Sequence, residues 1–305
     1  MQKNVFQDSI NEKVRLYIIF HYFLNGGFMV KVAALWSGGK DSCLASYEAT
    51  LMGYEVSYLL SYNETASSNM SKNPLNLIYN AVGRASPSIV QNLLSLVYNK
   101  DLSTMIPHEV SPEIINMQAQ AMEIPLIQGE VSWDTLQQFL KSSLSTLKET
   151  GIEGLVFGVV PPHYPIDSSE KLREYRTLVA HKEWLNRLCH ELDLKPITPL
   201  WERSPEQILR DLIGKGFEAI VIVVNSKYFG EEWLGRKIDY DFINAAYKLK
   251  REKSVHIGGS GYHTLVIDGP SFKKRLKIAR SRKIWKNSYG VLEISKVFLE
   301  KKSEK

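Results

Sequence analysis

The sequence has very few cysteines and no long apolar run. Two cysteines in 305 residues, Cys43 and Cys189, exclude a disulfide-dense secreted scaffold and an all-cysteine zinc site. Without a cluster of His and Cys at ligand spacing, both are expected to be free thiols of a cytoplasmic protein. A bilayer-spanning helix needs roughly 20 apolar residues. Residues 16–24 come nearest, but this run is short and contains His21, so no membrane association is expected.

Net charge is also small, but it is unevenly distributed. The chain carries 38 Lys and Arg against 33 Asp and Glu, a net charge of +5. Residues 273–305 alone carry +9, which leaves −4 for the rest. This basic segment suits contact with a nucleic acid, a ribosomal particle or an acidic protein, or it is a solvated lysine-rich surface on a terminal helix or strand. No nucleic-acid-binding motif accompanies it.

Alternating strand and helix patterns predict an α/β fold. With 44% apolar residues the chain can bury a substantial core. A short apolar run at 31–35 predicts a buried strand, followed by a helix over 43–52 that ends at Gly53, and then a strand over 55–60. Such a β–α–β order predicts a parallel sheet with right-handed crossovers. The pattern continues with helices over 112–122, 133–149 and 172–192, and with strands over 125–127, 154–158 and 195–198.

The chain divides into an extension and two predicted domains. Residues 1–28 precede the first strand and form the extension. Residues 29–198 form the first domain, with insertions at about 63–103, predicted to be helical, and at 161–172. Residues 199–305 form a smaller α/β domain with the basic tail. For that part the sequence predicts helices over 205–215 and across most of 228–249, and strands over 219–224, 264–267 and 289–294.

The hexapeptide SGGKDS at residues 37–42 lies between a buried strand and a helix N-terminus. Backbone N–H groups and the positive end of a helix dipole point at one spot there, which suits phosphate. Gly38 and Gly39 allow close backbone approach, and Ser37 and Ser42 add hydroxyl groups. Residues 37–42 are called the phosphate loop below.

Two charged residues of the phosphate loop are candidates for catalysis. Lys40 can neutralise phosphate charge, and Asp41 can bind Mg²⁺ or cap the helix. The loop is neither a Walker A motif nor a dinucleotide fingerprint, since the glycine spacings of both are missing. An ordinary glycine-rich turn with an Asp or Ser cap remains the alternative.

The hexapeptide resembles the loop of the ATP-pyrophosphatase (PP-loop) superfamily, and further segments make the resemblance specific. They occur in order as MQAQAMEIPL (117–126), EGLVFG (153–158), LKPITPLW (194–201), GFEAIV (216–221), WLGRKID (233–239) and YHTLVIDGP (262–270). Together they resemble the diphthine–ammonia ligase family over about residues 29–290, the two insertions excepted.

The resemblance implies an adenine nucleotide α-hydrolase-like domain, of the HUP/Rossmann-like parallel-sheet type, with a smaller α/β domain closing over the acceptor. It implies an ATP-dependent acid–ammonia ligase that forms AMP and pyrophosphate through an acyl-adenylate. The implied substrates are ATP with Mg²⁺, free ammonium, and diphthine carried by elongation factor 2. In this reading the phosphate loop and Gly158 bind ATP, Lys40 and Asp41 are catalytic, and Asp41 holds Mg²⁺.

Four residues within the matched segments are candidate substrate contacts, namely Arg236, Asp239, His263 and Thr264. His108 is a fifth, because members of the family that the chain resembles often have a histidine in the corresponding loop, near ATP. The alternative for His108 is an ordinary loop histidine. The alternative for Arg236 and Asp239 is a surface ion pair on a helix.

One segment departs from the family pattern. Diphthamide-type members carry Gly-Glu-x-Gly-Glu-Tyr before the last strand, whereas residues 256–264 read HIGGSGYHT and lack both glutamates. The acceptor is therefore left open between diphthine and a small-molecule carboxylate. A non-catalytic module that binds ATP or AMP is a third reading. A tRNA-modifying PP-loop enzyme would normally show catalytic cysteines, which Cys43 and Cys189 do not supply.

Overall fold

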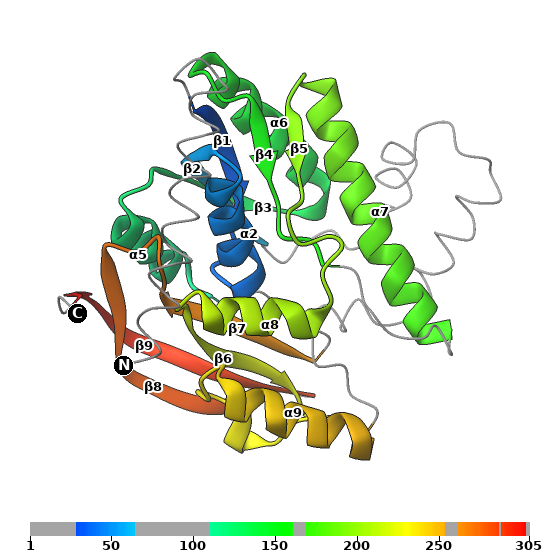
Figure 1. The fold of residues 1–305 in the computed structure, drawn as a ribbon, viewed down its shortest axis with the longest axis vertical. Helices are drawn as coiled ribbons and strands as arrows, with labels where there is room; N and C mark the ends of the chain where they lie inside the picture. Colours follow the sequence, from blue (N-terminus) through cyan, green and yellow to red (C-terminus); the bar gives the residue numbers. More distant parts are fainter. Residues whose placement is uncertain (1–28, 65–109, 161–168, 254–260, 287, 303–305) are drawn as a thin grey trace.

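The computed structural model describes residues 29–64, 110–160, 169–253, 261–286 and 288–302. The predicted extension at 1–28, nearly all of the predicted helical insertion, and His108 lie outside these residues. The described chain forms two sheets, one five-stranded and one four-stranded, which lie one above the other in Figure 1.

The first sheet is wholly parallel, as the sequence predicts. Its strands follow the order β3-β2-β1-β4-β5, so β1 is central. The strands are β1 (Val30–Leu35), β2 (Tyr54–Glu64), β3 (Leu126–Val131), β4 (Gly154–Val156) and β5 (Lys195–Ile197). The chain runs outward from β1 to β2 and β3, then returns to the other side of β1 with β4 and β5. Between β1 and β4 the sheet therefore has the topological switch point at which open α/β sheets bind ligands.

Helices cover both faces of the parallel sheet. One face packs against α6 (Trp133–Glu149) and α7 (Ser169–Glu191), whose buried residues Leu140 and Leu185 share a core cluster with Leu155 of β4. The other face packs against α2 (Lys40–Leu51) and α5 (Pro112–Met122), and this second core cluster continues into the four-stranded sheet. The two sheets are thus joined by one continuous apolar core.

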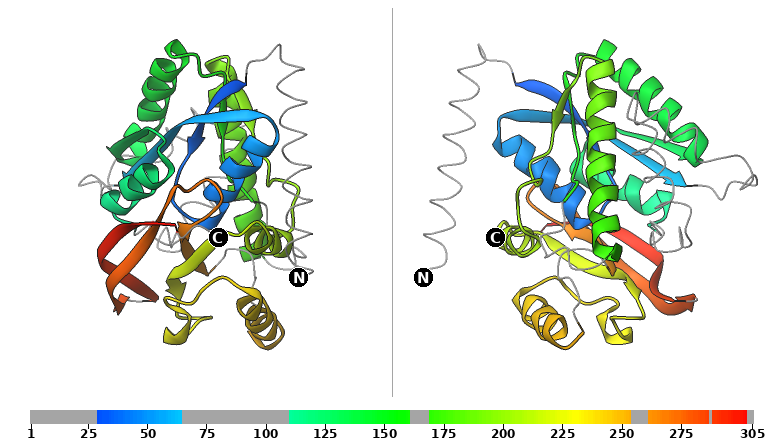
Figure 2. Two further views of the ribbon diagram at one scale, coloured as in Figure 1. Left: turned by 60° about the vertical axis from the view of Figure 1, so that its left-hand side comes forward. Right: turned by 90° about the vertical axis from the view of Figure 1, so that its right-hand side faces the viewer.

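The second sheet is antiparallel and follows the order β7-β6-β9-β8. Its strands are β6 (Glu218–Asn225), β7 (Tyr262–Asp268), β8 (Lys274–Lys286) and β9 (Tyr289–Lys301). Helix α8 (Pro205–Gly214) lies between the sheets, while α9 (Tyr240–Lys253) lies on the side of the second sheet away from α2 (Figures 1 and 2).

Three expectations from the sequence differ from the structure. The helix expected from residue 43 begins at Lys40, so it includes half of the phosphate loop. The helix expected across most of 228–249 is instead a short 3₁₀ turn, η2 (Glu231–Trp233), followed by α9. Gly235, at φ +80°, interrupts the helical conformation between them. The predicted strand at 289–294 extends to Lys301 and pairs with β8, a strand that the sequence analysis did not identify.

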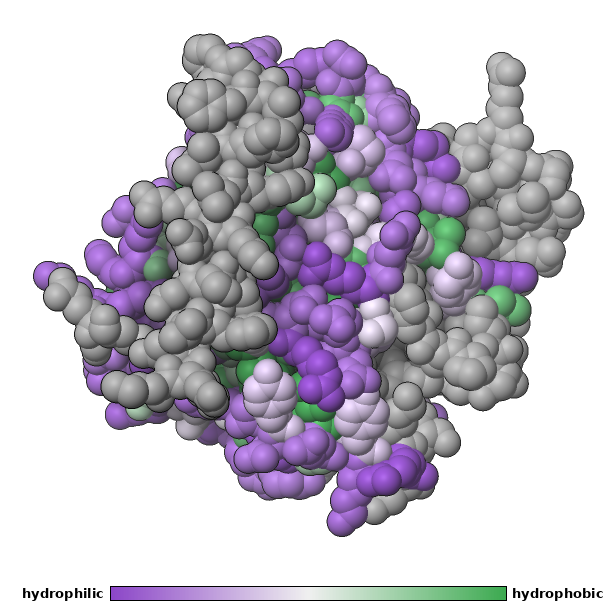
Figure 3. Space-filling view, in the orientation of Figure 1, coloured by the Kyte–Doolittle hydropathy of each residue, from purple (hydrophilic) through white to green (hydrophobic). Residues whose placement is uncertain are grey.

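Strand β8 forms the edge of the second sheet and carries much of the basic segment. Charged residues are common on edge strands, where they oppose pairing with other chains. On the face drawn in Figure 3, hydrophilic residues predominate on the described surface. None of the described helices combines the length and apolarity needed to cross a bilayer.

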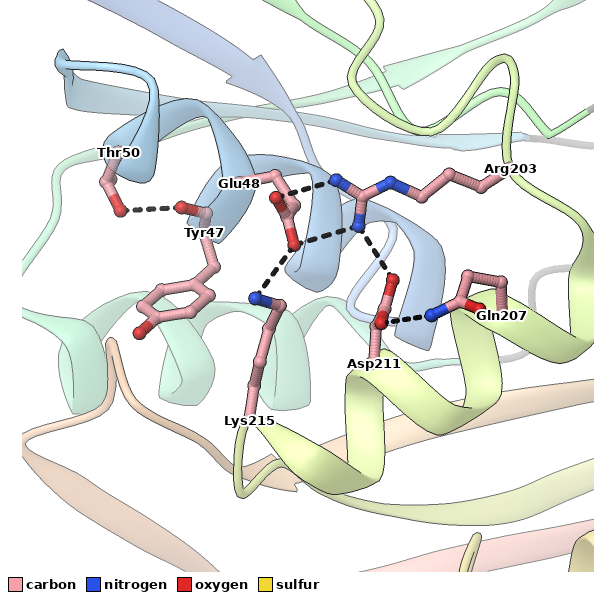
Figure 4. A network of polar contacts seen from close by, with 7 residues as sticks. All are labelled: Tyr47, Glu48, Thr50, Arg203, Gln207, Asp211 and Lys215. Carbon is pink, nitrogen blue, oxygen red and sulfur yellow. Dashed lines mark hydrogen bonds and ion pairs between the residues drawn. The ribbon is translucent and has the colours of Figure 1, made fainter. Parts of the chain in front are cut away.

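A partly buried ion-pair network ties α2 to α8 (Figure 4). The Arg203 guanidinium donates to both carboxylate oxygens of Glu48, at 2.9 and 2.8 Å, and also to Asp211 at 2.8 Å. The ammonium of Lys215 lies 3.2 Å from the same Glu48 carboxylate. Burial alone would raise the pKa of Glu48. The hydrogen bond from Arg203 and the charges of Lys215 and Arg203 outweigh burial and hold that pKa below its ordinary value.

Candidate functional site

The phosphate loop lies at the carboxyl end of the central strand β1. Strand β4, the neighbour across the switch point, ends at Val156 and leads to Gly158 on the same edge of the sheet. A Cβ added at Gly158 would lie 2.6 Å from the backbone oxygen of Asp41 and 2.9 Å from the nitrogen of Ser42. The structure therefore brings Gly158 against the start of α2, and only glycine fits there.

The first turn of α2 presents backbone donors at this edge. The first bond within the helix runs from the Cys43 nitrogen to the Gly39 oxygen. The N–H groups of Lys40, Asp41 and Ser42 thus have no partner inside the helix. Gly39 is the N-cap and contributes no side-chain cap. Such a turn attracts anions through its donors and its dipole.

Serine hydroxyls brace the phosphate loop. Ser37 donates to the Ser42 hydroxyl at 3.2 Å, and the Ser42 hydroxyl donates to the Gly39 carbonyl at 3.1 Å. Gly38 has φ +74°, a conformation that other residues rarely adopt. Together these contacts hold the loop in a single backbone path.

Lys40 and Asp41 form an ion pair at the centre of the site. The Lys40 ammonium lies 2.7 Å from Asp41 Oδ2, and the Lys40 side chain is 5% exposed. The second oxygen, Asp41 Oδ1, is buried and has no hydrogen-bond partner. An acceptor left this way is costly unless a ligand satisfies it.

The second sheet reaches directly into this site through β7. The hydroxyl of Thr264 accepts from the Lys40 backbone nitrogen at 3.0 Å and so caps α2 in place of Gly39. The Lys40 ammonium lies 5.6 Å from the centre of the Tyr262 ring. Burial, with a further contribution from the negative charge of Asp41, raises the pKa of Tyr262 well above its ordinary value, so its phenol remains protonated.

Other predicted substrate residues are placed away from the loop. Side chains alternate along a strand, so His263 faces away from Thr264 and from α2. Arg236 stacks over the Trp233 ring at 4.8 Å and donates to the Asp241 carbonyl at 3.0 Å. Asp239 accepts from the Phe242 nitrogen at 2.7 Å and caps α9. Arg236 and Asp239 thus have structural partners within the second half of the chain.

Two buried residues of the site, Gln118 and Tyr262, escaped the sequence analysis. Gln118 of α5 is fully buried, and its amide contacts the Gly38 carbonyl at 3.0 Å. It lies within the matched segment 117–126, but an amide on an amphipathic helix is usually a surface residue, so nothing in the sequence marks it. Tyr262 escaped attention in the same way.

The residues present fit a magnesium ion that arrives with a nucleotide. Among the described residues there is no group of three or more His, Cys, Asp or Glu that would form an all-protein metal site. Magnesium in nucleotide enzymes is commonly held by one or two carboxylates together with phosphate oxygens and waters. The partnerless Asp41 Oδ1 supplies such a carboxylate oxygen beside the free amides of α2.

Comparisons with known proteins match both halves of the chain. The model of the diphthamide synthase N-terminal domain matches residues 30–85, which include the phosphate loop. The model of the diphthamide synthase C-terminal domain matches residues 204–299, which include β7.

Similar curated proteins include three named diphthine–ammonia ligase. The human protein is 25% identical over 269 residues, which cover 83% of this chain and 84% of that protein. The mouse protein is 22% identical over 282 residues, which cover 90% of this chain and 94% of that protein. The Schizosaccharomyces pombe protein is 24% identical over 86% of this chain but only 38% of its own length. A solved structure described as a predicted subunit of tRNA methyltransferase from Methanocaldococcus jannaschii covers 79% of this chain and 98% of its own, at 12% identity and a TM-score of 0.34.

Proposed function

Because this chain belongs to the diphthine–ammonia ligase family, we propose that it converts the carboxylate of diphthine into an amide, using ATP and free ammonium. The observation that supports this most directly is the phosphate loop at the switch point, with its free amides, the Lys40–Asp41 pair and the cap from Thr264. The diphthine would be presented by elongation factor 2.

The reaction proceeds in two steps. An acceptor carboxylate oxygen attacks the α-phosphorus of ATP, the bond to the bridging oxygen breaks, and pyrophosphate leaves. Ammonia then attacks the acyl carbon of the resulting adenylate, AMP departs with the C–O electron pair, and the nitrogen loses a proton. The residues of the site act mainly on the first step, in which negative charge accumulates on the leaving pyrophosphate.

Each loop residue has a part in that step. The amides of Gly38 and Gly39 bind phosphate oxygens, as do the Ser37 and Ser42 hydroxyls once they rotate away from their contacts within the loop. The Lys40 ammonium neutralises charge on the leaving group, while the Lys40 amide stays on Thr264. Asp41 would hold Mg²⁺ through Oδ1, and magnesium there supplies further charge neutralisation. Gly158 lets the end of β4 approach the start of α2 and so shapes the nucleotide site.

The proposal also includes a division into two domains and a location in the cytosol, a reducing compartment. The whole parallel sheet precedes residue 198 and the whole antiparallel sheet follows it, which supports domains at 29–198 and 199–305. The second domain would close over the acyl-adenylate and exclude water, which would otherwise hydrolyse it. Cys43 and Cys189 are buried free thiols, in keeping with a cytosolic enzyme.

The missing glutamates at 256–264 favour a second candidate, the same chemistry on a small-molecule carboxylate. A test incubates the purified chain with ATP, Mg²⁺, ¹⁵N-ammonium and diphthine-bearing elongation factor 2. It measures pyrophosphate, orthophosphate and label in the acceptor. Acceptor-dependent pyrophosphate and labelled amide support the proposal, whereas orthophosphate as the only inorganic product contradicts it. ATP binding without turnover on any carboxylate would indicate a non-catalytic nucleotide-binding module.

The Asp41→Ala variant tests the catalytic role of the loop, since Thr264 and not Asp41 caps α2 in the structure. If the carboxylate orders Mg²⁺ and the loop at the transition state, pyrophosphate release should fall by ~10²-fold or more. Turnover close to that of the wild type would mean that Asp41 only balances the charge of Lys40 at the start of α2.

A further inference from the structure

The Gln118 amide joins three elements that are far apart in the sequence. Its Oε1 accepts from the Trp36 indole nitrogen at 3.0 Å. Its Nε2 donates to the Gly38 carbonyl of the phosphate loop at 3.0 Å and to the Val266 carbonyl of β7 at 2.7 Å. Both amide protons are therefore used, one on the loop and one on the second sheet.

These contacts form a closed ring, because Val266 also binds the loop directly. The Val266 nitrogen donates to the Gly38 carbonyl at 3.0 Å, the same oxygen that Gln118 holds. A Cβ at Gly38 would lie 2.4 Å from Gln118 Oε1, so the amide can keep this position only against a glycine. The loop, α5 and β7 are thus fixed together at one peptide group.

Fixing the orientation of the Gly38 carbonyl also fixes the orientation of the Gly39 N–H group. In a planar trans peptide the carbonyl and the following N–H point in opposite directions. With the Gly38 carbonyl turned toward Gln118 and Val266, the Gly39 N–H points away from them. The orientation of a phosphate-binding amide therefore depends on a side chain of α5 and a strand of the second sheet.

We propose that Gln118 is a positioning residue for the phosphate loop, and that the loop holds its pyrophosphate-binding shape only while β7 is docked on it. This inference rests on the proposed function, since it assumes that the loop binds the phosphates of ATP. Both amide protons of Gln118 are donated to backbone carbonyls, so neither is left for a phosphate oxygen. It acts through the Gly38–Gly39 peptide.

Two variants test the positioning role. Gln118→Glu keeps the shape but replaces the donor group with an oxygen that faces two carbonyls, and Gln118→Met removes the polar contacts at similar length. Each should weaken ATP binding by about tenfold or more. AMP lacks the β and γ phosphates, so its affinity should change much less. A side chain that merely supported the fold would lower both affinities in parallel.

Two controls separate positioning from stability. Gln120→Glu makes the same chemical change at an exposed position on the same helix and should leave ATP binding unchanged. Leu140→Val removes volume from the core cluster on the opposite face of the parallel sheet, and it should lower the melting temperature without altering the ratio of ATP to AMP affinity.

Calorimetric titration of each variant with ATP and with AMP gives the decisive ratio. A lowered ratio in both Gln118 variants supports the proposal, and an unchanged ratio overturns it. Wild-type protein that binds ATP no more tightly than AMP would refute the phosphate-loop assignment, and the inference with it.

Hydrogen exchange on the wild-type chain keeps the test independent of whether the variants fold. Pyrophosphate is the probe, and it should slow amide exchange both at residues 37–42 and along β7, because the two move as one unit. Protection confined to the loop would refute the coupling while leaving the phosphate site itself intact.

Discussion

The Glu48 network offers a quantitative test of how α2 is held in place. Glu48→Gln keeps the side-chain shape but removes the charge between Arg203 and Lys215. The Glu48 side chain is 9% exposed, so its two cationic partners lose a largely buried counter-charge.

The expected loss follows from the burial of each partner. Breaking a buried ion pair by removing one charge costs about 3–5 kcal/mol. Arg203 is 29% exposed and retains Asp211, and the new amide oxygen still accepts one hydrogen bond, so the cost is smaller. We expect the free energy of unfolding to fall by about 2 kcal/mol, which for a chain of 305 residues corresponds to a melting temperature lower by about 3 °C.

The pH dependence supplies an independent check with a defined sign. The pKa of Glu48 is lowered on folding, so its contribution is complete above its ordinary value of 4.5 and is lost as pH falls through the lowered value. The difference in melting temperature between wild type and Glu48→Gln should be constant near neutrality and shrink below about pH 4.5.

Thermal melts followed by circular dichroism, at pH values from neutral to acidic, provide the measurement. Glu206→Gln is the matched control, because Glu206 pairs with Arg210 on the surface of α8 and both side chains are more than a third exposed. That variant should lose less than about 0.5 kcal/mol. Equal effects of the two substitutions, or a Glu48 effect that persists unchanged into acid, would refute the reasoning.

Three further predictions concern other parts of the chain. Gly158→Ala should weaken ATP binding about tenfold or more, because the new Cβ meets backbone atoms that cannot move alone; Gly214→Ala, in open space, is the control, and equal Kd values would contradict the prediction. Burial raises the pKa of both thiols, that of Cys189 to about 12, so alkylation at pH 8 should be slow in the folded chain and fast in urea. A chain beginning at Met29 should fold and bind ATP, with a stability loss within ~1–3 kcal/mol; an insoluble product would contradict it.

Local patterns in the sequence were sufficient for the parallel sheet. The strand, loop and helix order around residues 37–42 predicts the phosphate site because each element is specified by neighbours in sequence. The start of α2 was misplaced by three residues because its cap, Thr264, comes from a distant strand. Nothing in the sequence near Lys40 indicates that its backbone N–H donates to a hydroxyl of the other sheet.

The second sheet was harder to predict, for a related reason. Strand β8 carries seven Lys and Arg over 13 residues, which hides the apolar alternation of Leu276, Ile278 and Ile284. The role of Gln118 was beyond sequence reasoning altogether, since a glutamine on a helix shows its function only when its three partners are folded around it.

The cap on α2 also bears on how the chain is made. Lys40 and Thr264 are 224 residues apart. At synthesis rates of 5–20 residues per second, the ribosome needs about 10–45 s between the two. Throughout that interval the apolar face of α2 and α5 remains uncovered, because β6 and β7, the strands that bury it in the finished protein, have not yet been made. The nascent first half therefore exposes this apolar surface during synthesis, and its phosphate loop is completed only when translation is nearly over.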